Sequence, residues 1–306
     1  MTNPAIAGLP WVLGGNVFGM TIQRDASFAV LDAFYAAGGR MIDTADVYSA
    51  WVPGNKGGES ETILGEWFAA SGKRAEIRLH TKTGMLGGKE LYEPARVLAS
   101  LEASLERLQT DYLDLYYAHR DYEELPMADI VAAFDGAVKT GKVRALGASN
   151  FTAARLSEAL AAAAATGATP FSVLQNEYNL IARQAYGTDL QDLCVRHEIP
   201  MLPFFGLASG FLTGKYRSAD DLGKSPRGAR LGDLITSGAP MLAVMDDVVR
   251  ETGATHAQVA LAWLRVQPGI AAPIASATSV GQIEELAAAA TLELSEEQLA
   301  RLTAVQ

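Results

Sequence analysis

Two kinds of hydrophobic pattern alternate along the chain. Short apolar runs rich in branched residues suit strands that are buried on both faces. Eight such runs lie at 11–16, 40–45, 76–82, 112–118, 142–149, 171–177, 199–205 and 269–275. Between them apolar residues recur every three or four positions, which predicts helices at 25–38, 59–71, 94–108, 127–140, 152–166, 187–197, 241–266, 280–289 and 295–303. The pattern therefore predicts a strand followed by a helix throughout.

This alternation is typical of a parallel sheet with right-handed crossovers. Eight strands favour closure into a (β/α)8 barrel, an α/β fold, although a doubly wound open sheet has the same local pattern. No linker composition divides the 306 residues, so we expect residues 1–306 to form a single barrel domain. The segments 49–58 and 211–240 are too long for simple connections. Both follow predicted strands, which places them as long loops on the C-terminal face of a barrel, where active-site loops lie.

Turn and capping residues support several of these boundaries. Gly38 and Gly39 end the first helix, and Gly141 ends the fourth. Ser295 and Gln298 have the spacing of a capping box at the start of the last helix.

Composition narrows the classes of function. Hydrophobic residues make up 49% of the chain and charged residues 20%, as in a globular protein with a large core. The formal net charge of -10 disfavours nucleic acid and anionic lipid as partners. The N-terminal residues do not show a basic region followed by a long apolar run, and no apolar run in the sequence is long enough to span a membrane. We therefore expect a cytoplasmic location. The one cysteine, Cys194, lies in an amphipathic pattern and is expected to be a core thiol.

Candidate chemistry gathers at the ends of three neighbouring predicted strands. Asp43, Lys82 and His119 lie at or just beyond the ends of the second, third and fourth strands, and Tyr48 follows in the loop after the second. In a barrel these four side chains would converge on one rim. Charged residues are also common at strand ends for reasons of solvation alone. Of the other polar residues nearby, His80 is expected in the core and Asp46 as a loop cap or secondary polar contact.

These four residue types suit one kind of proton transfer. A phenol has a pKa of about 10 and donates its proton more readily beside a cation, which Lys82 could supply. Asp43 could keep that lysine protonated, and His119 could donate a hydrogen bond to a substrate oxygen or extend the proton path. Such a set would protonate an oxygen that gains negative charge, as a carbonyl oxygen does when hydride arrives at its carbon.

Signatures of other sites are missing from the sequence. The glycine-rich stretch GGNVFG has Asn16 where a Rossmann turn needs its second glycine, and no phosphate-binding P-loop or metal-ligand spacing occurs. We therefore predict no metal site.

At the residues that carry this chemistry, the sequence resembles the aldo-keto reductase family over nearly its whole length. The matching motifs occur in family order at the predicted strand ends, and they are IDTADVY with GGESETILG, TK at 81–82, YLDLYYAHRD, VRALGASNF, QNEYN, FGLASGFLTGKY and PIASATSVGQIEE. The resemblance implies a (β/α)8 barrel that reduces small-molecule carbonyl compounds with a nicotinamide cofactor. It makes Tyr48 the general acid, with Asp43, Lys82 and His119 completing a tetrad.

The resemblance also implies a set of cofactor contacts. Gly15, Asn16 and Val17 would contact the cofactor or substrate, while Ser149, Asn150 and Gln175 would lie near the carboxamide and Phe204 would stack on the nicotinamide. The pyrophosphate would be held by Leu207, Ser209, Gly210 and Lys215, and the adenosine end by Ser276, Thr278, Gln282 and Glu285. For Ser149 and Asn150 an alternative is a helix N-cap.

Three positions depart from the family's habit. Phe204 stands where tyrosine is common, Thr278 where an arginine often meets the 2′-phosphate, and Leu286 where asparagine often follows Glu285. A 2′-phosphate favours arginine or lysine. NADPH is thus expected from the family's habit, and NADH remains an alternative.

Two other functions use the same residues. One is a nucleotide-binding regulatory subunit such as the family's potassium-channel β subunits, although the complete tetrad favours catalysis. The other is a Schiff-base aldolase acting through Lys82, which needs a neutral amine that Asp43 disfavours. Trp51, Val52 and Pro53 could wall a substrate pocket or be packing residues, and Arg227 and Arg230 could bind an anion or be solvated. Neither the substrate nor the oligomeric state can be read from the sequence.

Overall fold

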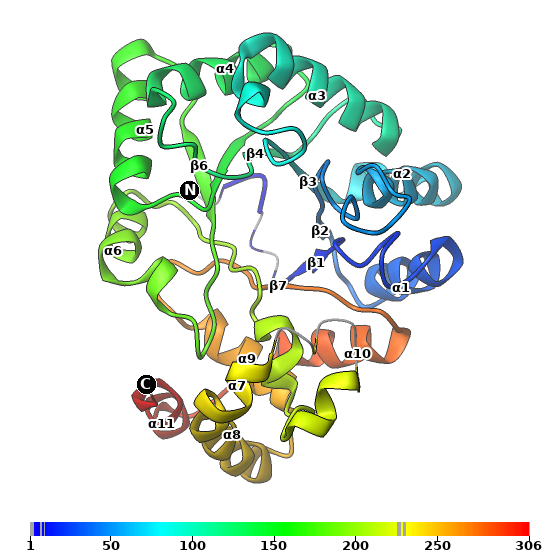
Figure 1. The fold of residues 1–306 in the computed structure, drawn as a ribbon, viewed down its shortest axis with the longest axis vertical. Coiled ribbons are helices and arrows are strands. Elements are labelled where there is room, and N and C mark those ends of the chain that lie inside the picture. The colour runs from blue at the N-terminus through cyan, green and yellow to red at the C-terminus, as the bar shows by residue number, and fades with distance from the viewer. Residues whose placement is uncertain (1–2, 7, 9, 225–227, 229–230, 306) are drawn as a thin grey trace.

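A single parallel sheet forms the centre of the molecule. The computed structural model describes residues 3–6, 8, 10–224, 228 and 231–305. Its sheet has the strand order β6-β5-β4-β3-β2-β1-β7 and curls into a ring (Figure 1). The strands are β1 (Val12–Gly14), β2 (Met41–Asp43), β3 (Arg78–Thr83), β4 (Leu115–Ala118), β5 (Leu146–Ser149), β6 (Phe171–Gln175) and β7 (Ile274–Ala275). Neighbours in sequence are neighbours in space from β1 to β6, as the strand-helix alternation predicts.

Helices surround this ring on its outer side (Figure 1). The α-helices are α1 (Arg24–Ala36), α2 (Glu59–Ser71), α3 (Pro94–Leu108), α4 (Met127–Lys139), α5 (Ala153–Thr166), α6 (Thr188–Arg196), α7 (Gly232–Ser237), α8 (Ala239–Thr252), α9 (His256–Arg265), α10 (Val280–Ala289) and α11 (Glu296–Ala304). Short 3-10 helices are η1 (Arg74–Glu76), η2 (Lys89–Tyr92), η3 (Gln184–Tyr186), η4 (Ala208–Thr213) and η5 (Ala219–Lys224). The (β/α)8 expectation is confirmed as an α/β barrel.

The predicted seventh strand, 199–205, was wrong as a regular strand. The segment runs between β6 and β7 but makes only isolated bridges, among them those of Met201 with Leu174 and Ile270. Pro200 and Pro203 interrupt it, since proline has no N–H to donate to a neighbouring strand. Their carbonyls still accept, Pro200 from Leu174 at 3.0 Å and Pro203 from Ile274 at 2.9 Å. This irregular segment therefore completes the barrel between β6 and β7.

The helix predicted at 241–266 was also wrong, because two helices occupy that range. Gly253 ends α8 in the left-handed region with φ 71°, and Thr255 with Gln258 forms a capping box that starts α9. The long segment 211–240, expected as a loop, contains η5 and α7. The expected capping box of Ser295 and Gln298 is present at α11.

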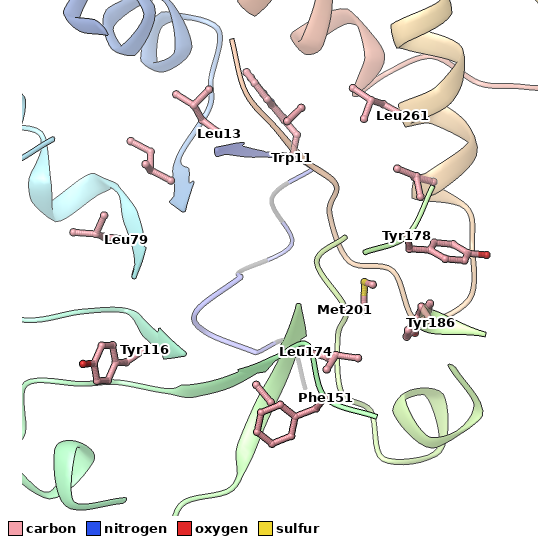
Figure 2. Close-up of a cluster of buried hydrophobic side chains, with 14 of the residues drawn as sticks. Trp11, Leu13, Leu79, Tyr116, Phe151, Leu174, Tyr178, Tyr186, Met201 and Leu261 are labelled. Atoms are coloured by element: carbon pink, nitrogen blue, oxygen red, sulfur yellow. The ribbon is translucent and has the colours of Figure 1, made fainter. Parts of the chain in front are cut away.

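The core has an inner and an outer part. The outer part lies between strands and helices, and Figure 2 shows Leu13, Leu79 and Tyr116 within it. The inner part fills the barrel below the candidate site and includes Ala5, Ile6, Val12, Met41, Leu115, Tyr117, Val173 and Leu202. Side chains alternate along a strand, so Asp43 lies one layer above Met41, and Gln175 one layer above Val173. The apolar filling thus leaves polar groups at the carboxyl end of the strands.

His80 occupies the lower layer, as expected for a core histidine. It is fully buried, and its Nε2 lies 3.0 Å from the carbonyl oxygen of Ala5. The N-terminal residues therefore close the barrel from the end opposite to the candidate site. Cys194 is buried, as expected, and burial raises the pKa of its thiol to about 12.

Candidate active site

The ammonium group of Lys82 is the centre of the site. The Lys82 side chain is fully buried on β3. Its Nζ donates hydrogen bonds to Asp43 Oδ2 at 2.6 Å, to the carbonyl oxygen of Thr44 at 2.8 Å and to Tyr48 Oη at 2.8 Å. These three bonds use all three protons of an ammonium group. Because Lys82 donates to the oxygen of Tyr48, the hydroxyl proton of Tyr48 is left to be donated elsewhere.

The protonation states follow from burial and from these contacts. Burial has the largest single effect and lowers the pKa of Lys82, but Asp43 and Tyr48 together outweigh it, so the pKa is raised and the ammonium form is kept. Burial raises the pKa of Tyr48, and the opposing effect of Lys82 does not cancel it. The sequence-based expectation of a cation beside the phenol is met, but Tyr48 remains a protonated phenol with a raised pKa.

Gln175 fixes the other oxygen of the same carboxylate. Its Nε2 donates to Asp43 Oδ1 at 2.9 Å across the barrel from β6 to β2, and both side chains are buried. Sequence reasoning placed Gln175 beside a cofactor and did not foresee this contact, because the two residues lie 132 positions apart. Both carboxylate oxygens of Asp43 thus accept hydrogen bonds, one from Lys82 and one from Gln175.

His119 follows β4 and faces Tyr48. The two ring centroids are 6.0 Å apart, and His119 Nδ1 is buried without a hydrogen-bond partner among the residues that the structure describes. Asn150 Nδ2 donates to the His119 carbonyl oxygen at 2.9 Å. Burial, then the charges of Lys82 and Arg120, lower the pKa of His119 well below its usual value. The imidazole is therefore neutral, with a ring nitrogen that can donate one hydrogen bond.

This arrangement of Asp43, Lys82, Tyr48 and His119 can be set beside known proteins. The sequence profile described as the Aldo/keto reductase family matches residues 10–306. The chain belongs to the aldo/keto reductase family.

Relatives of this aldo/keto reductase extend over most of its length. It is 32% identical to the uncharacterized oxidoreductase YrpG of Bacillus subtilis, over 95% of this chain and 90% of that protein. It is 29% identical to norsolorinic acid reductase of Aspergillus flavus, over 90% and 70% respectively. It is also 29% identical to the aldo-keto reductase yakc [NADP(+)] of Schizosaccharomyces pombe, over 90% and 80%. The family and these relatives make the protein an oxidoreductase.

Several residues that the family resemblance assigns to the cofactor lie together in this aldo/keto reductase. Asn150 Nδ2 lies 3.1 Å from Ser149 Oγ, and the Asn150 backbone N–H donates to the Gln175 carbonyl oxygen at 3.2 Å. Asn150 has the left-handed φ of 61°, which asparagine tolerates. The alternative role of Ser149 and Asn150 as a helix cap was wrong, because Thr152 caps α5.

A second group lies at the first strand end. Ser276 Oγ donates to Asn16 Oδ1 at 2.6 Å, and the Gly15 N–H donates to the Asp43 carbonyl oxygen at 2.7 Å. A Cβ on Gly15 would come within 2.9 Å of Ser60 Oγ, so the backbone at Gly15 lies close against Ser60. The side chain of Val17, the third residue of this group, is buried in the outer core.

The loop that follows residues 199–205 has a backbone that could hold a pyrophosphate. Ala208, Ser209 and Gly210 have consecutive left-handed φ values of 47°, 56° and 96°, a backbone form that can turn N–H groups toward an anion. The Lys215 ammonium lies 3.7 Å from where a Cβ on Gly210 would be. Lys215 has no carboxylate partner in the part of the chain that the structure describes. Leu207 is half-buried beside this turn, and its carbonyl accepts from Gly210 at 2.8 Å.

The remaining predicted contacts lie on or near α10 and beside the ring of strands. Thr278 donates to Gln282 Oε1 from its N–H at 2.7 Å and from its hydroxyl at 3.2 Å. Glu285 contributes a carbonyl oxygen, which accepts from Gln258 at 3.3 Å. Phe204 is half-buried, with its ring 5.1 Å from that of Phe205. These groups could hold a nicotinamide dinucleotide along the carboxyl-end face.

Other residues support the site without having been predicted. Ser60 Oγ donates to the Gly15 carbonyl oxygen at 2.8 Å and lies 2.8 Å from Thr44 Oγ1, which joins the ends of β1 and β2. The motif GGESETILG contains Ser60 but gave no sign of this contact. Asn176 Oδ1 accepts from the Asn150 N–H at 2.8 Å.

The loop after β2 places further side chains beside Tyr48. Trp51 is 53% exposed, and its ring centroid is 6.3 Å from that of Tyr48, so it flanks the site. Asp46 is buried and accepts a hydrogen bond from Thr83 at 2.7 Å, which fits the expected secondary polar contact. Arg227 and Arg230 lie outside the described residues.

The described part of the chain contains no helix that is long and apolar enough to cross a membrane.

Proposed function

We propose that the protein reduces an aldehyde or ketone to an alcohol with NAD(P)H, with Tyr48 as the general acid. The observation that carries the proposal is the direction of the bond between Lys82 and Tyr48. Lys82 donates to the phenolic oxygen at 2.8 Å, so the proton of Tyr48 is not used in this bond and can pass to a substrate oxygen. The family membership and the oxidoreductases among the relatives support the same reaction class.

Each residue has a defined part in this reaction. A nicotinamide cofactor, when bound, would supply the hydride for the carbonyl carbon. As negative charge develops on the carbonyl oxygen, Tyr48 donates its proton, and Lys82 stabilises the phenolate that results. Asp43 keeps Lys82 protonated, Gln175 orients Asp43, and neutral His119 donates a hydrogen bond that positions the carbonyl oxygen.

For the cofactor we propose NADPH, with NADH as the alternative. One relative is named for NADP(+). The groups proposed to hold the pyrophosphate are Ser209, Gly210 and Lys215, and those proposed for the adenosine end are Ser276, Thr278 and Gln282. Thr278 supplies a hydroxyl and no positive charge for a 2′-phosphate, so NADH stays the alternative cofactor.

The expected partner is a small carbonyl compound in the cytoplasm. A Schiff-base reaction at Lys82 requires a neutral amine, and the raised pKa of Lys82 opposes it. Borohydride in the presence of a carbonyl compound should therefore leave Lys82 unmodified.

The test is turnover with a panel of carbonyl compounds and both cofactors. Wild-type protein should oxidise NADPH or NADH only when a carbonyl compound is present. Tyr48→Phe should lower kcat by about 100-fold or more, since general acid catalysis contributes at least that much, while cofactor binding is retained. Undiminished turnover in Tyr48→Phe would refute the mechanism. Tight nucleotide binding with no turnover of any carbonyl compound would instead favour a regulatory subunit.

A further inference from the structure

A cavity of about 600 Å³ opens on the carboxyl-end face of the barrel, next to His119. Its walls come from the loops after three neighbouring strands, with Met85 after β3, Arg120 and Tyr122 after β4, and Asn150 after β5. The volume is within the range of small-molecule sites. The cavity therefore offers room for a small organic group.

The backbone of Arg120 is fixed beside this cavity. Tyr92 Oη donates to the Arg120 carbonyl oxygen at 2.6 Å, and the Arg120 N–H lies 3.3 Å from the same hydroxyl. The Tyr92 ring packs edge-on against Tyr122, with ring centroids 5.2 Å apart, and Tyr122 Oη donates to the Gly84 carbonyl oxygen at 2.5 Å. The Arg120 backbone is thus held by a packed pair of tyrosines, while its side chain is exposed.

The guanidinium of Arg120 lies 5.2 Å from the centroid of the Tyr122 ring. An arginine that packs on an aromatic ring keeps the N–H groups along its edge free, and that edge matches a planar carboxylate. Among the described residues, no carboxylate lies within ion-pair distance of Arg120. Its positive charge is therefore available to a ligand.

The carboxylates around the cavity are mostly engaged elsewhere. Asp121 accepts from Arg155 at 2.7 Å and 2.9 Å. Glu124 lies 3.9 Å from Lys89. Glu123 also lines the cavity and has no cationic partner within the described part of the chain, so it is the one carboxylate there that competes for Arg120.

Arg120 is also close enough to His119 for its charge to act on the imidazole, after burial and Lys82, in lowering the pKa of His119. Asn150 lines the cavity with Arg120 and donates to the His119 carbonyl oxygen at 2.9 Å, so the cation lies near the group that we propose to position the carbonyl oxygen. A substrate held by both would place an anionic group in the cavity and its carbonyl at Tyr48.

We propose that this cavity is a substrate subsite in which Arg120 binds a carboxylate, so that the enzyme favours carbonyl compounds that carry a carboxylate group. This inference rests on the proposed carbonyl reduction and specifies its substrate class. Arg120 is then a specificity-determining residue, which forms a two-pronged charge-assisted hydrogen bond with the substrate.

A matched pair of aldehydes tests the proposal. We would measure kcat and KM for 4-carboxybenzaldehyde and benzaldehyde in wild type, Arg120→Gln and Arg120→Lys. The ratio of kcat/KM for the carboxylated to the uncharged aldehyde should fall about 10-fold or more in Arg120→Gln, mainly through KM. Arg120→Lys should recover part of the ratio, since it keeps the charge but loses the planar fork.

Arg96, an exposed arginine on α3, provides the control. Arg96→Gln removes the same charge from the surface and should leave the ratio at the wild-type value. Equal losses for both aldehydes in Arg120→Gln would overturn the subsite, since a merely structural role of Arg120 affects both substrates alike. If wild type reduces benzaldehyde and shows no dependence on Arg120, this inference fails while the proposed function stands. If wild type reduces no carbonyl compound, both fail.

Discussion

The carboxylate of Asp43 lies 2.6 Å from the ammonium of Lys82, and both side chains are shielded from solvent. Such a pair is costly to break, because removal of one partner leaves the other charge buried. Lys82→Met should therefore lower the free energy of unfolding by about 3 kcal/mol or more, in addition to abolishing turnover. Urea denaturation followed by circular dichroism measures this.

Two variants serve as controls for that result. The double variant Asp43→Asn/Lys82→Met should regain part of the lost stability, since no charge is left unpaired. Arg250→Met removes one partner of an exposed pair with Asp247 and should cost less than about 1 kcal/mol. A Lys82→Met protein as stable as wild type would contradict the buried-pair interpretation.

The pH dependence of turnover follows from the two aromatic groups of the site. The pKa of Tyr48 is raised above 10.0 by burial, so its phenol stays protonated up to high pH. The pKa of His119 lies well below 6.5, so its imidazole stays neutral. We therefore expect kcat/KM for carbonyl reduction to be nearly constant between about pH 6 and about pH 9. An inflection near pH 6.5 that disappears in His119→Asn would show that His119 titrates and would contradict this.

Much of this arrangement was visible in the sequence. The runs that contain Asp43 and Lys82 predicted strands whose ends meet at one rim, because parallel strands share a direction. The bonds among Lys82, Asp43 and Tyr48 follow from that geometry. The sequence does not predict which side chains contact each other across the barrel, as Gln175 and Asp43 do. The alternation of side chains along a strand predicts the layer in which a side chain lies but not its neighbour in that layer.

Two other differences between the predicted and the observed elements had local signals in the sequence, which the hydrophobic periodicity did not reveal. Pro200 and Pro203 stand inside the run predicted as the seventh strand, and each removes a backbone donor. Gly253 followed by the spacing of Thr255 and Gln258 marks the end of one helix and the start of the next. Arg120 lies within the motif YLDLYYAHRD, but neither its lack of an ion pair nor the cavity beside it can be inferred from local sequence.

Asp46 should make the stability depend on pH. Burial raises the pKa of Asp46 to about 7, Thr83 acts to lower it and Glu61 to raise it. Between about pH 4 and pH 7 the unfolded chain releases this proton while the folded protein keeps it, so stability falls as pH rises. The loss attributable to Asp46 should reach about 2 to 3 kcal/mol between pH 5 and pH 7.

Asp46→Asn tests this because asparagine does not titrate. The difference in unfolding free energy between pH 5 and pH 7 should become smaller in Asp46→Asn by that amount. Asp25→Asn changes a carboxylate that is 95% exposed on α1 and should keep the wild-type dependence. If Asp46→Asn also keeps the wild-type pH dependence of the unfolding free energy, Asp46 is ionised throughout this range and the prediction is wrong.

Gly147 tests the packing beneath the site. A Cβ at Gly147 would come within 2.3 Å of the ring of Tyr117, which is fully buried. Gly147→Ala should therefore destabilise the protein by about 1 to 3 kcal/mol, as overpacking of a core does. Gly136→Ala is the matched control, since a Cβ there meets nothing within 4 Å on α4, and helix propensity should make it stabilising by roughly 0.5 to 1 kcal/mol. Thermal unfolding of both variants checks the sign of each effect, and a stable Gly147→Ala protein would mean that Tyr117 can move aside.

Thr278 tests how the adenosine end is recognised. Its N–H and hydroxyl both donate to Gln282 Oε1 in the turn before α10, so the turn is ordered but carries no positive charge at this position. Thr278→Arg should lower KM for NADPH about 10-fold relative to KM for NADH, because only NADPH has a 2′-phosphate for the guanidinium to bind. Thr291→Arg adds the same charge at the exposed far end of α10 and should leave the ratio of the two KM values unchanged. Steady-state kinetics with both cofactors measures these ratios. If Thr278→Arg shifts the ratio no more than Thr291→Arg does, the 2′-phosphate of NADPH does not lie at Thr278.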